Sequence, residues 1–172
     1  MKSPVTEICD LSSELPPDAP DAPQWLVDAL QVPREEGWVT SEGCEVHYFR
    51  WGDPANPPLL LMHGFLAHAR CMAFIAPFLA EHYHVVAYDL SGMGDSGVRS
   101  SYPDAIRAQE VVDVARETGL FDHAIKPIVI AHSYGGHVGL AAMNDFHELF
   151  GGLVVCDLMV LRPERLKAHF GG

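Results

Sequence analysis

Hydrophobic and polar residues alternate over one part of the chain and gather into short apolar runs over the rest. Residues 38–40 and 45–51 alternate on either side of a Ser41-Glu42-Gly43 turn, which predicts an antiparallel hairpin with half-exposed strands. Four short apolar runs predict further strands, at residues 59–62, 84–88, 128–131 and 152–156.

Helical periodicity occupies most of the sequence between these runs. It predicts helices at residues 69–81, 102–118 and 134–146. Strands that alternate with helices form parallel sheets, with the helices packed on both faces. The sequence therefore predicts an α/β fold, mostly parallel, with an antiparallel hairpin at its start.

The first 36 residues have a different composition from the remainder. Pro16, Pro17, Pro20 and Pro23 exclude a long helix over this stretch. Residues 24–31 then show the spacing of a short amphipathic helix. We expect residues 1–36 to form a proline-rich acidic arm with this helix at its end, and residues 37–172 to form the main domain.

Composition narrows the classes of partner. The chain has 172 residues and a formal net charge of −12, which disfavours nucleic acids and anionic membranes as partners. Its four cysteines show no metal-binding spacing, so we expect free thiols and a cytoplasmic location. The N-terminus shows no signal peptide, and no apolar run is long enough to span a membrane.

The most informative segment joins a predicted strand directly to a predicted helix. In residues 128–136 an apolar run ends at Ser133, with Ala131 two residues before it and Gly135 two residues after it. A nucleophile on such a sharp turn requires small residues at these two positions. The alternative is a serine that only caps the helix.

Two further motifs follow earlier predicted strands. His63-Gly64-Phe65 comes after residues 59–62, and Asp89-Leu90-Ser91-Gly92-Met93-Gly94-Asp95-Ser96 comes after residues 84–88. In this order, the three motifs resemble the α/β-hydrolase family, in the branch of esterases, epoxide hydrolases and carbon–carbon bond hydrolases. The resemblance covers about residues 38–160 and implies an incomplete α/β-hydrolase fold.

The resemblance also implies roles for individual residues. Ser133 would be the nucleophile, and the backbone N–H groups of Phe65 and Tyr134 would form the oxyanion hole. Epoxide hydrolases of this fold carry an aspartate at the turn, so Ser133 implies acyl transfer. The resemblance gives structural roles in the surrounding loops to His63, Gly64, Asp89 and Gly135.

The rest of a catalytic triad is harder to place. Members of the family usually carry the acid after the seventh strand and the histidine after the eighth, whereas the sequence ends at Gly172, soon after the sixth predicted strand. Asp157, at the end of that strand, is a candidate acid. His169 is the only histidine that follows it. We therefore expect a truncated chain with little or no activity of its own.

The sequence thus predicts a serine hydrolase that acts on a small, apolar, ester-like or acyl substrate and needs no cofactor or metal. The alternative is a non-catalytic protein, or an inactive fragment, that binds a small ligand on the same fold. A sixth strand at the edge of the sheet, with Val154 and Val155, also predicts association between copies of the chain.

Overall fold

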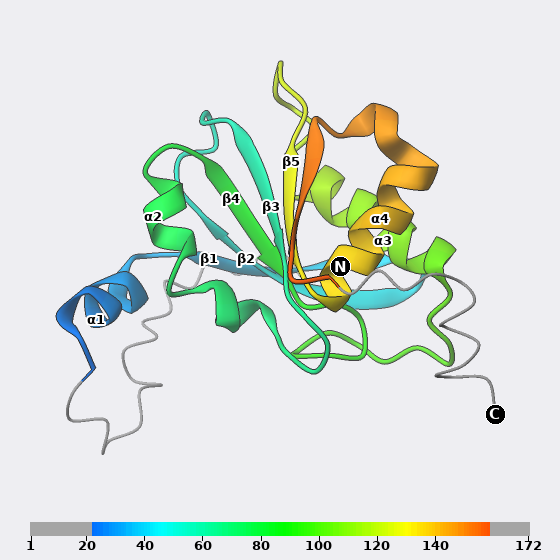
Figure 1. The fold of residues 1–172 in the computed structure, drawn as a ribbon, viewed down its shortest axis with the longest axis horizontal. Coiled ribbons are helices and arrows are strands. Elements are labelled where there is room, and N and C mark those ends of the chain that lie inside the picture. Colours follow the sequence, from blue (N-terminus) through cyan, green and yellow to red (C-terminus); the bar gives the residue numbers. More distant parts are fainter. Residues whose placement is uncertain (1–21, 159–172) are drawn as a thin grey trace.

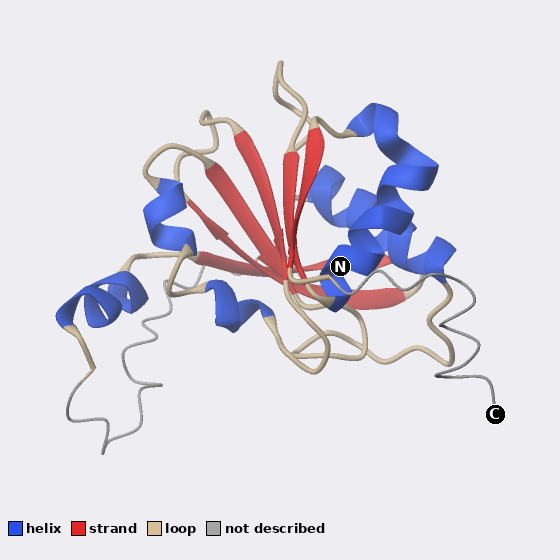
Figure 2. Cartoon of the chain, in the orientation of Figure 1, coloured by secondary structure: helices blue, strands red, loops and turns tan. Residues whose placement is uncertain are grey.

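The computed structural model describes residues 22–158, which form one mixed sheet with helices on both faces (Figures 1 and 2). The strands are β1 (Glu35–Ser41), β2 (Cys44–Trp51), β3 (Pro58–Met62), β4 (His84–Tyr88), β5 (Ile128–His132) and β6 (Gly152–Cys156). Their order across the sheet is β1-β2-β4-β3-β5-β6. Strand β2 pairs antiparallel with β1 and β4, and the other pairs are parallel. The predicted fold class is confirmed.

The helices divide between the two faces of the sheet. They are α1 (Gln24–Gln31), η2 (Ala69–Met72), α2 (Ala76–Ala80), α3 (Asp104–Glu117), α4 (Tyr134–Phe146) and η3 (His147–Leu149). Helices α3 and α4 pack together on one face, and α1, η2 and α2 lie on the other (Figure 1). Helix α1 begins and ends at the residues that its periodicity predicts.

The sheet separates two hydrophobic cores. Every residue of β3 and β4 is buried, because both strands lie inside the sheet and are covered on both faces. Successive side chains point to opposite faces, so Leu60 joins the core under α3 and α4, while Leu61 joins the core under η2 and α2.

The prediction of one continuous helix at residues 69–81 is wrong. The chain instead forms the short 3₁₀ helix η2 and then the separate helix α2. Pro77 lies in the first turn of α2, where its missing N–H has no role. In the middle of a longer helix the same proline would remove a hydrogen bond and clash with the preceding turn.

We expect Leu60→Ala to lower the free energy of unfolding by about 2–5 kcal/mol, since Leu60 is fully buried and its truncation leaves a cavity. The matched control is Leu66→Ala, because Leu66 is 81% exposed and its truncation should change stability by less than about 0.5 kcal/mol. Urea unfolding measures both values. Equal effects of the two substitutions would contradict the assigned core.

Candidate active site

Ser133 occupies a strained turn between a strand and a helix. It is the single residue between β5 and α4, and its backbone has φ 50° and ψ −116°. A positive φ is unfavourable for any residue with a side chain. The Ser133 N–H donates to the Cys156 carbonyl at 2.9 Å, and the Ser133 carbonyl accepts from the Gly136 N–H at 2.8 Å. These two hydrogen bonds hold the serine in its strained conformation.

The loop after β3 passes so close to this turn that only glycine fits at the points of contact. A Cβ atom on Gly135 would lie 2.5 Å from the His63 carbonyl oxygen, and one on Gly64 would lie 2.8 Å from Nδ1 of His132. Neither distance leaves room for a methyl group. Glycine at both positions therefore allows the His63-Gly64-Phe65 loop to lie against the serine.

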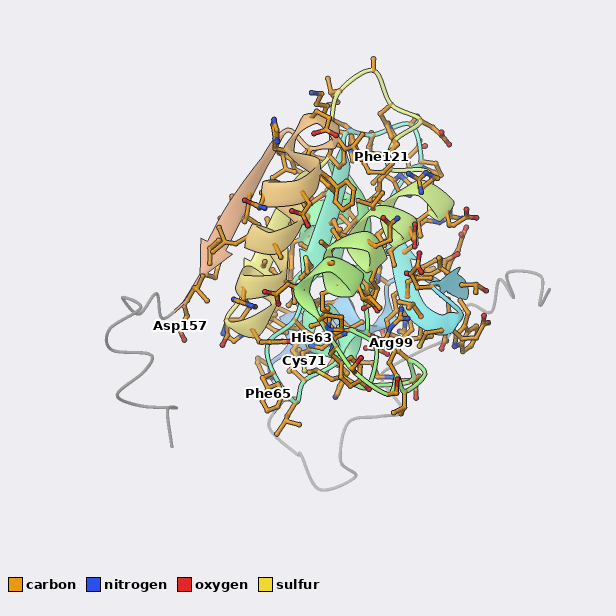
Figure 3. The ribbon with its side chains drawn as sticks, turned by 90° about the vertical axis from the view of Figure 1, so that its right-hand side faces the viewer. His63, Phe65, Cys71, Arg99, Phe121 and Asp157 are labelled. Carbon is orange, nitrogen blue, oxygen red and sulfur yellow. The ribbon has the colours of Figure 1, made fainter. Side chains whose placement is uncertain are left out.

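Two backbone donors flank the serine. The rings of Phe65 and Tyr134 meet edge to face, with centroids 5.6 Å apart, which brings the two loops together. Within residues 22–158, the backbone N–H of neither residue donates a hydrogen bond. Tyr134 also begins a helix of 13 residues, whose N-terminus favours negative charge. Figure 3 shows Phe65 at the end of the molecule where this loop turns.

His63 is buried, and both of its ring nitrogens are engaged. Nε2 accepts a hydrogen bond from the Leu90 N–H at 3.0 Å, which leaves Nδ1 to donate to the Gly64 carbonyl at 2.7 Å. Burial lowers the pKa of His63, so the ring stays neutral near pH 7. His63 joins the loop after β3 to the loop after β4, and it has no free nitrogen with which to act as a base.

Asp89 connects three segments through its buried carboxylate. It accepts hydrogen bonds from Nδ1 of His47 at 2.8 Å, from the Ala69 N–H at 2.5 Å and from the Asp95 N–H at 2.9 Å. Burial alone would raise the pKa of Asp89, but the hydrogen bonds from His47 and the two amides outweigh it and lower the pKa. The carboxylate is therefore ionised, and it holds the loop after β4 in place.

Comparison with known proteins identifies a family for this chain. A profile described as the alpha/beta hydrolase family matches residues 59–171, which is more than half of the chain. The chain belongs to the α/β-hydrolase family.

Three similar proteins illustrate the relationship. The uncharacterized hydrolase YugF of Bacillus subtilis is 27% identical over 77% of this chain and 48% of its own length. The soluble epoxide hydrolase of Corynebacterium sp. strain C12 is 31% identical over 73% of this chain and 41% of its own length. A solved structure of a membrane phospholipase A, described as a bacterial virulence factor, is 32% identical with a TM-score of 0.68, over 76% of this chain and 41% of that one.

This chain therefore spans about half the length of the curated relatives that it matches. Its described helices are all too short or too polar to cross a bilayer.

A buried polar network supports the first residue of α4. The guanidinium of Arg107 lies 4.5 Å from the centre of the Tyr102 ring and 5.9 Å from that of Tyr134. Its Nη1 donates to the Ser91 hydroxyl at 2.9 Å and lies 3.3 Å from the Glu110 carboxylate. Arg107 thus ties Tyr134, the residue directly after Ser133, to the loop after β4.

Sequence reasoning missed a second polar group, centred on His47. Its Nε2 lies 2.8 Å from Glu36, while its Nδ1 contacts Asp89. Burial lowers the pKa of His47, but the hydrogen bonds and charges of Asp89 and Glu36 outweigh it and raise the pKa. The predicted hairpin contained a signal for this contact. Trp38 pairs with His47, and Glu36 lies two residues before Trp38 on the same strand, so it faces the same side of the sheet.

The same group contains the one set of potential metal ligands found among residues 22–158. Glu36, His47 and Asp95 place one ligand atom each within 4.8 Å of one another. Arg70 already pairs with Asp95 at 2.6 Å, and Glu36 already pairs with His47. These three side chains therefore already have protein partners in place of a metal ion.

The remaining members of a triad are not assembled at Ser133. No histidine within residues 22–158 forms a hydrogen bond with the Ser133 hydroxyl. Asp157 follows β6 with φ 57°, is exposed, and forms no hydrogen bond with a described histidine. Figure 3 shows it at the end of β6. His169 lies outside the described residues.

We expect Gly135→Ala to destabilise the protein by about 1–3 kcal/mol, because its methyl group would push against the His63 carbonyl. The matched control is Gly152→Ala, whose methyl group would lie 3.6 Å from the nearest atom, in ordinary contact with Ile128. Thermal and urea unfolding measure both. A Gly135→Ala protein as stable as wild type would refute the close crossing of the two loops.

We expect Glu36→Gln to destabilise the protein in a pH-dependent way. Because the pKa of folded His47 is raised above 6.5, the contact of its imidazolium with Glu36 stabilises fully below that pH. The contribution, about 1–3 kcal/mol for a hydrogen bond between charged groups, is lost as the pH rises through the folded pKa. Urea unfolding of wild type and variant at about pH 6 and about pH 9 measures it. An equal difference at both values would argue against a charged His47.

Proposed function

We propose that this protein is the nucleophile-bearing part of a serine hydrolase that cleaves a small, apolar, ester-like or acyl substrate. The observation that carries the proposal is the Ser133 turn, with φ 50° and two backbone N–H donors beside it that lack partners among the described residues. A serine that only caps a helix needs neither the strained backbone nor the crossing loop. Because the chain spans about half of its relatives, the proposed activity is that of the whole hydrolase.

The proposed reaction begins when Oγ of Ser133 attacks the substrate's carbonyl carbon and its proton passes to a general base. The carbonyl oxygen becomes an oxyanion and accepts hydrogen bonds from the N–H groups of Phe65 and Tyr134. Each such donor is worth about 3–4 kcal/mol of transition-state stabilisation. The alcohol or thiol then leaves with the base's proton, and water hydrolyses the acyl group from Ser133.

Two features support the substrate class. A hydroxyl group at the turn, in place of a carboxylate, favours acyl transfer over epoxide opening. Phe65 and Leu66, which follow Gly64 in the loop that crosses the serine turn, are 64% and 81% exposed, so an apolar acyl or alcohol group would find apolar surface on this loop. The matched phospholipase A, an ester hydrolase by its name, is consistent with this chemistry.

The proposed general base is a histidine, and no histidine among residues 22–158 lies in hydrogen-bond contact with the Ser133 hydroxyl. The candidate acid is Asp157. We also propose a cytoplasmic location, where free thiols such as those of Cys44, Cys71 and Cys156 are usual. The proposed reaction uses no cofactor, because acyl transfer through a serine needs only protein groups and water.

A second candidate function has one observation in its favour. A pocket that holds a small apolar ligand without turnover needs no base, and no described histidine forms a hydrogen bond with the Ser133 hydroxyl. The two functions differ in whether Ser133 can be acylated or phosphonylated, because binding alone forms no covalent bond.

We therefore expect a fluorophosphonate probe to label Ser133 of the 172-residue chain slowly, and added imidazole to accelerate labelling by about tenfold or more as an external base. Ser133→Ala should abolish labelling, whereas Ser101→Ala, at an exposed serine, should not change it. Mass spectrometry of the labelled peptide identifies the modified residue. Absence of labelling with imidazole present, in a folded protein that still binds the substrate ester, would favour the non-catalytic function.

A further inference from the structure

A cluster of three buried charges joins α3 to the loop before it. Arg107 and Glu110 belong to α3, and Arg99 belongs to the loop between β4 and that helix (Figure 3). The Glu110 carboxylate lies 3.1 Å from the Arg99 guanidinium and 3.3 Å from that of Arg107, and each of the three side chains is 7% exposed or less. Two positive charges thus share one negative charge in the interior of the protein.

This cluster contributes less to stability than apolar packing of the same volume would. A buried ion pair often fails to recover the free energy that its ions lose on leaving water, and here one cation has no anion of its own within the cluster. Nε of Arg107 is also buried and has no hydrogen-bond partner among residues 22–158, which adds a further cost. What the cluster supplies instead is a single geometry for its neighbours, because its hydrogen bonds are directional.

The neighbours of Arg107 include both segments that flank Ser133. The Arg107 guanidinium lies 5.9 Å from the centre of the Tyr134 ring, within the range of a cation–π contact. The Phe65 ring meets the same tyrosine ring edge to face. Burial is the main cause of the lowered pKa of His63, and the charge of Arg107 adds to it, so Arg107 also lies near the loop that carries Phe65.

The guanidinium of Arg107 is itself held in place. Its Nη1 donates to the Ser91 hydroxyl at 2.9 Å, and the Ser91 N–H donates to the Glu110 carboxylate at 2.9 Å. The ring of Tyr102 lies 4.5 Å from its central carbon. Arg107 therefore has a fixed position from which it contacts the Tyr134 ring.

We propose that Arg107 is a positioning residue for the oxyanion site: by holding the Tyr134 ring, it holds the Tyr134 N–H in place beside Ser133. The inference rests on the proposed function, which assigns that N–H as an oxyanion donor. A donor of this kind stabilises the transition state only if it already points to the oxygen when the charge develops. Displacement of the Tyr134 ring therefore slows the attack by Ser133, without changing how a substrate first binds.

The test is the rate at which a fluorophosphonate probe labels Ser133 of the full chain, with imidazole as the base. Arg107→Met should lower the maximal rate constant of labelling about tenfold or more, because the phosphonyl oxygen uses the same donors as an oxyanion. The dissociation constant of the initial complex with the probe should stay the same. Arg107→Lys, which keeps a charged donor for Ser91, should recover part of the rate. The matched control is Arg116→Met, at an exposed arginine of the same helix, and it should be labelled as wild type is.

Thermal unfolding of the same variants separates positioning from a purely structural role. Arg107→Met leaves Glu110 paired with Arg99, so the cluster then holds one charge of each sign. We therefore expect its melting temperature to equal or exceed that of wild type. Labelling that slows only together with a loss of stability would overturn the proposal. Equal maximal rates for wild type and Arg107→Met would overturn it as well, and would leave the proposed function intact.

A failure of the proposed function gives a different result. A wild-type chain that is not labelled at Ser133 would overturn that function and this inference with it. If Arg107→Met does not fold, Ser91→Ala tests the same contact, because it removes the hydroxyl that accepts hydrogen bonds from Arg107 and Arg99. Loss of that hydrogen bond should slow labelling about threefold or more. Unchanged labelling of a folded Ser91→Ala chain would then overturn the proposal.

Discussion

The carboxylate of Asp89 is the constraint on which the active-site end of the sheet depends. A buried charge is tolerated only when hydrogen bonds replace the water that it has lost. Asp89 obtains them from the imidazole of His47, from the first turn of η2 and from the loop after β4. Three segments that are distant in sequence thus meet at one side chain. The position of the loop after β3, which continues into η2, follows from this meeting.

The strained serine depends on the same framework from the other side. His63 connects the loops after β3 and β4, and its carbonyl lies where any side chain on residue 135 would have to be. Arg107 adds support to Tyr134 through the ring contact and the Ser91 hydroxyl. The geometry around Ser133 is therefore held by neighbours on three loops, which is how a positive φ at a residue with a side chain can persist.

Much of this architecture could be predicted from local patterns. Apolar runs located β3, β4, β5 and β6 within one residue. For β3 and β4 the reason is that strands inside a sheet need apolar side chains on both faces. The helix expected over residues 69–81 breaks between η2 and α2, just before Pro77. That proline was a local signal for a new helix start, and the apolar periodicity was given more weight than it.

The Glu36–His47–Asp89 group was not predicted, because it depends on how three segments come together and no short motif encodes it. The His63-Gly64-Phe65 motif predicted that Gly64 lies close to the serine turn. It did not predict that His132 is the residue of the turn that Gly64 approaches. The roles of Ser133, Phe65 and Tyr134 remain predictions from the resemblance, which the geometry makes chemically reasonable. The general base remains unassigned, since a triad is defined by proximity in space and its histidine has no fixed place in a local pattern.

The division of the interior by the sheet affects how the sequence can change over evolutionary time. Leu60 and Leu61 are adjacent in the chain, yet they face different cores. Substitutions at the two positions can therefore be accepted independently of each other. Leu60 and Val111 of α3 belong to the same core. A change in volume in this core favours compensating changes among its other members, so substitutions at Leu60 are expected to covary with residues of the core under α3 and α4 more than with Leu61.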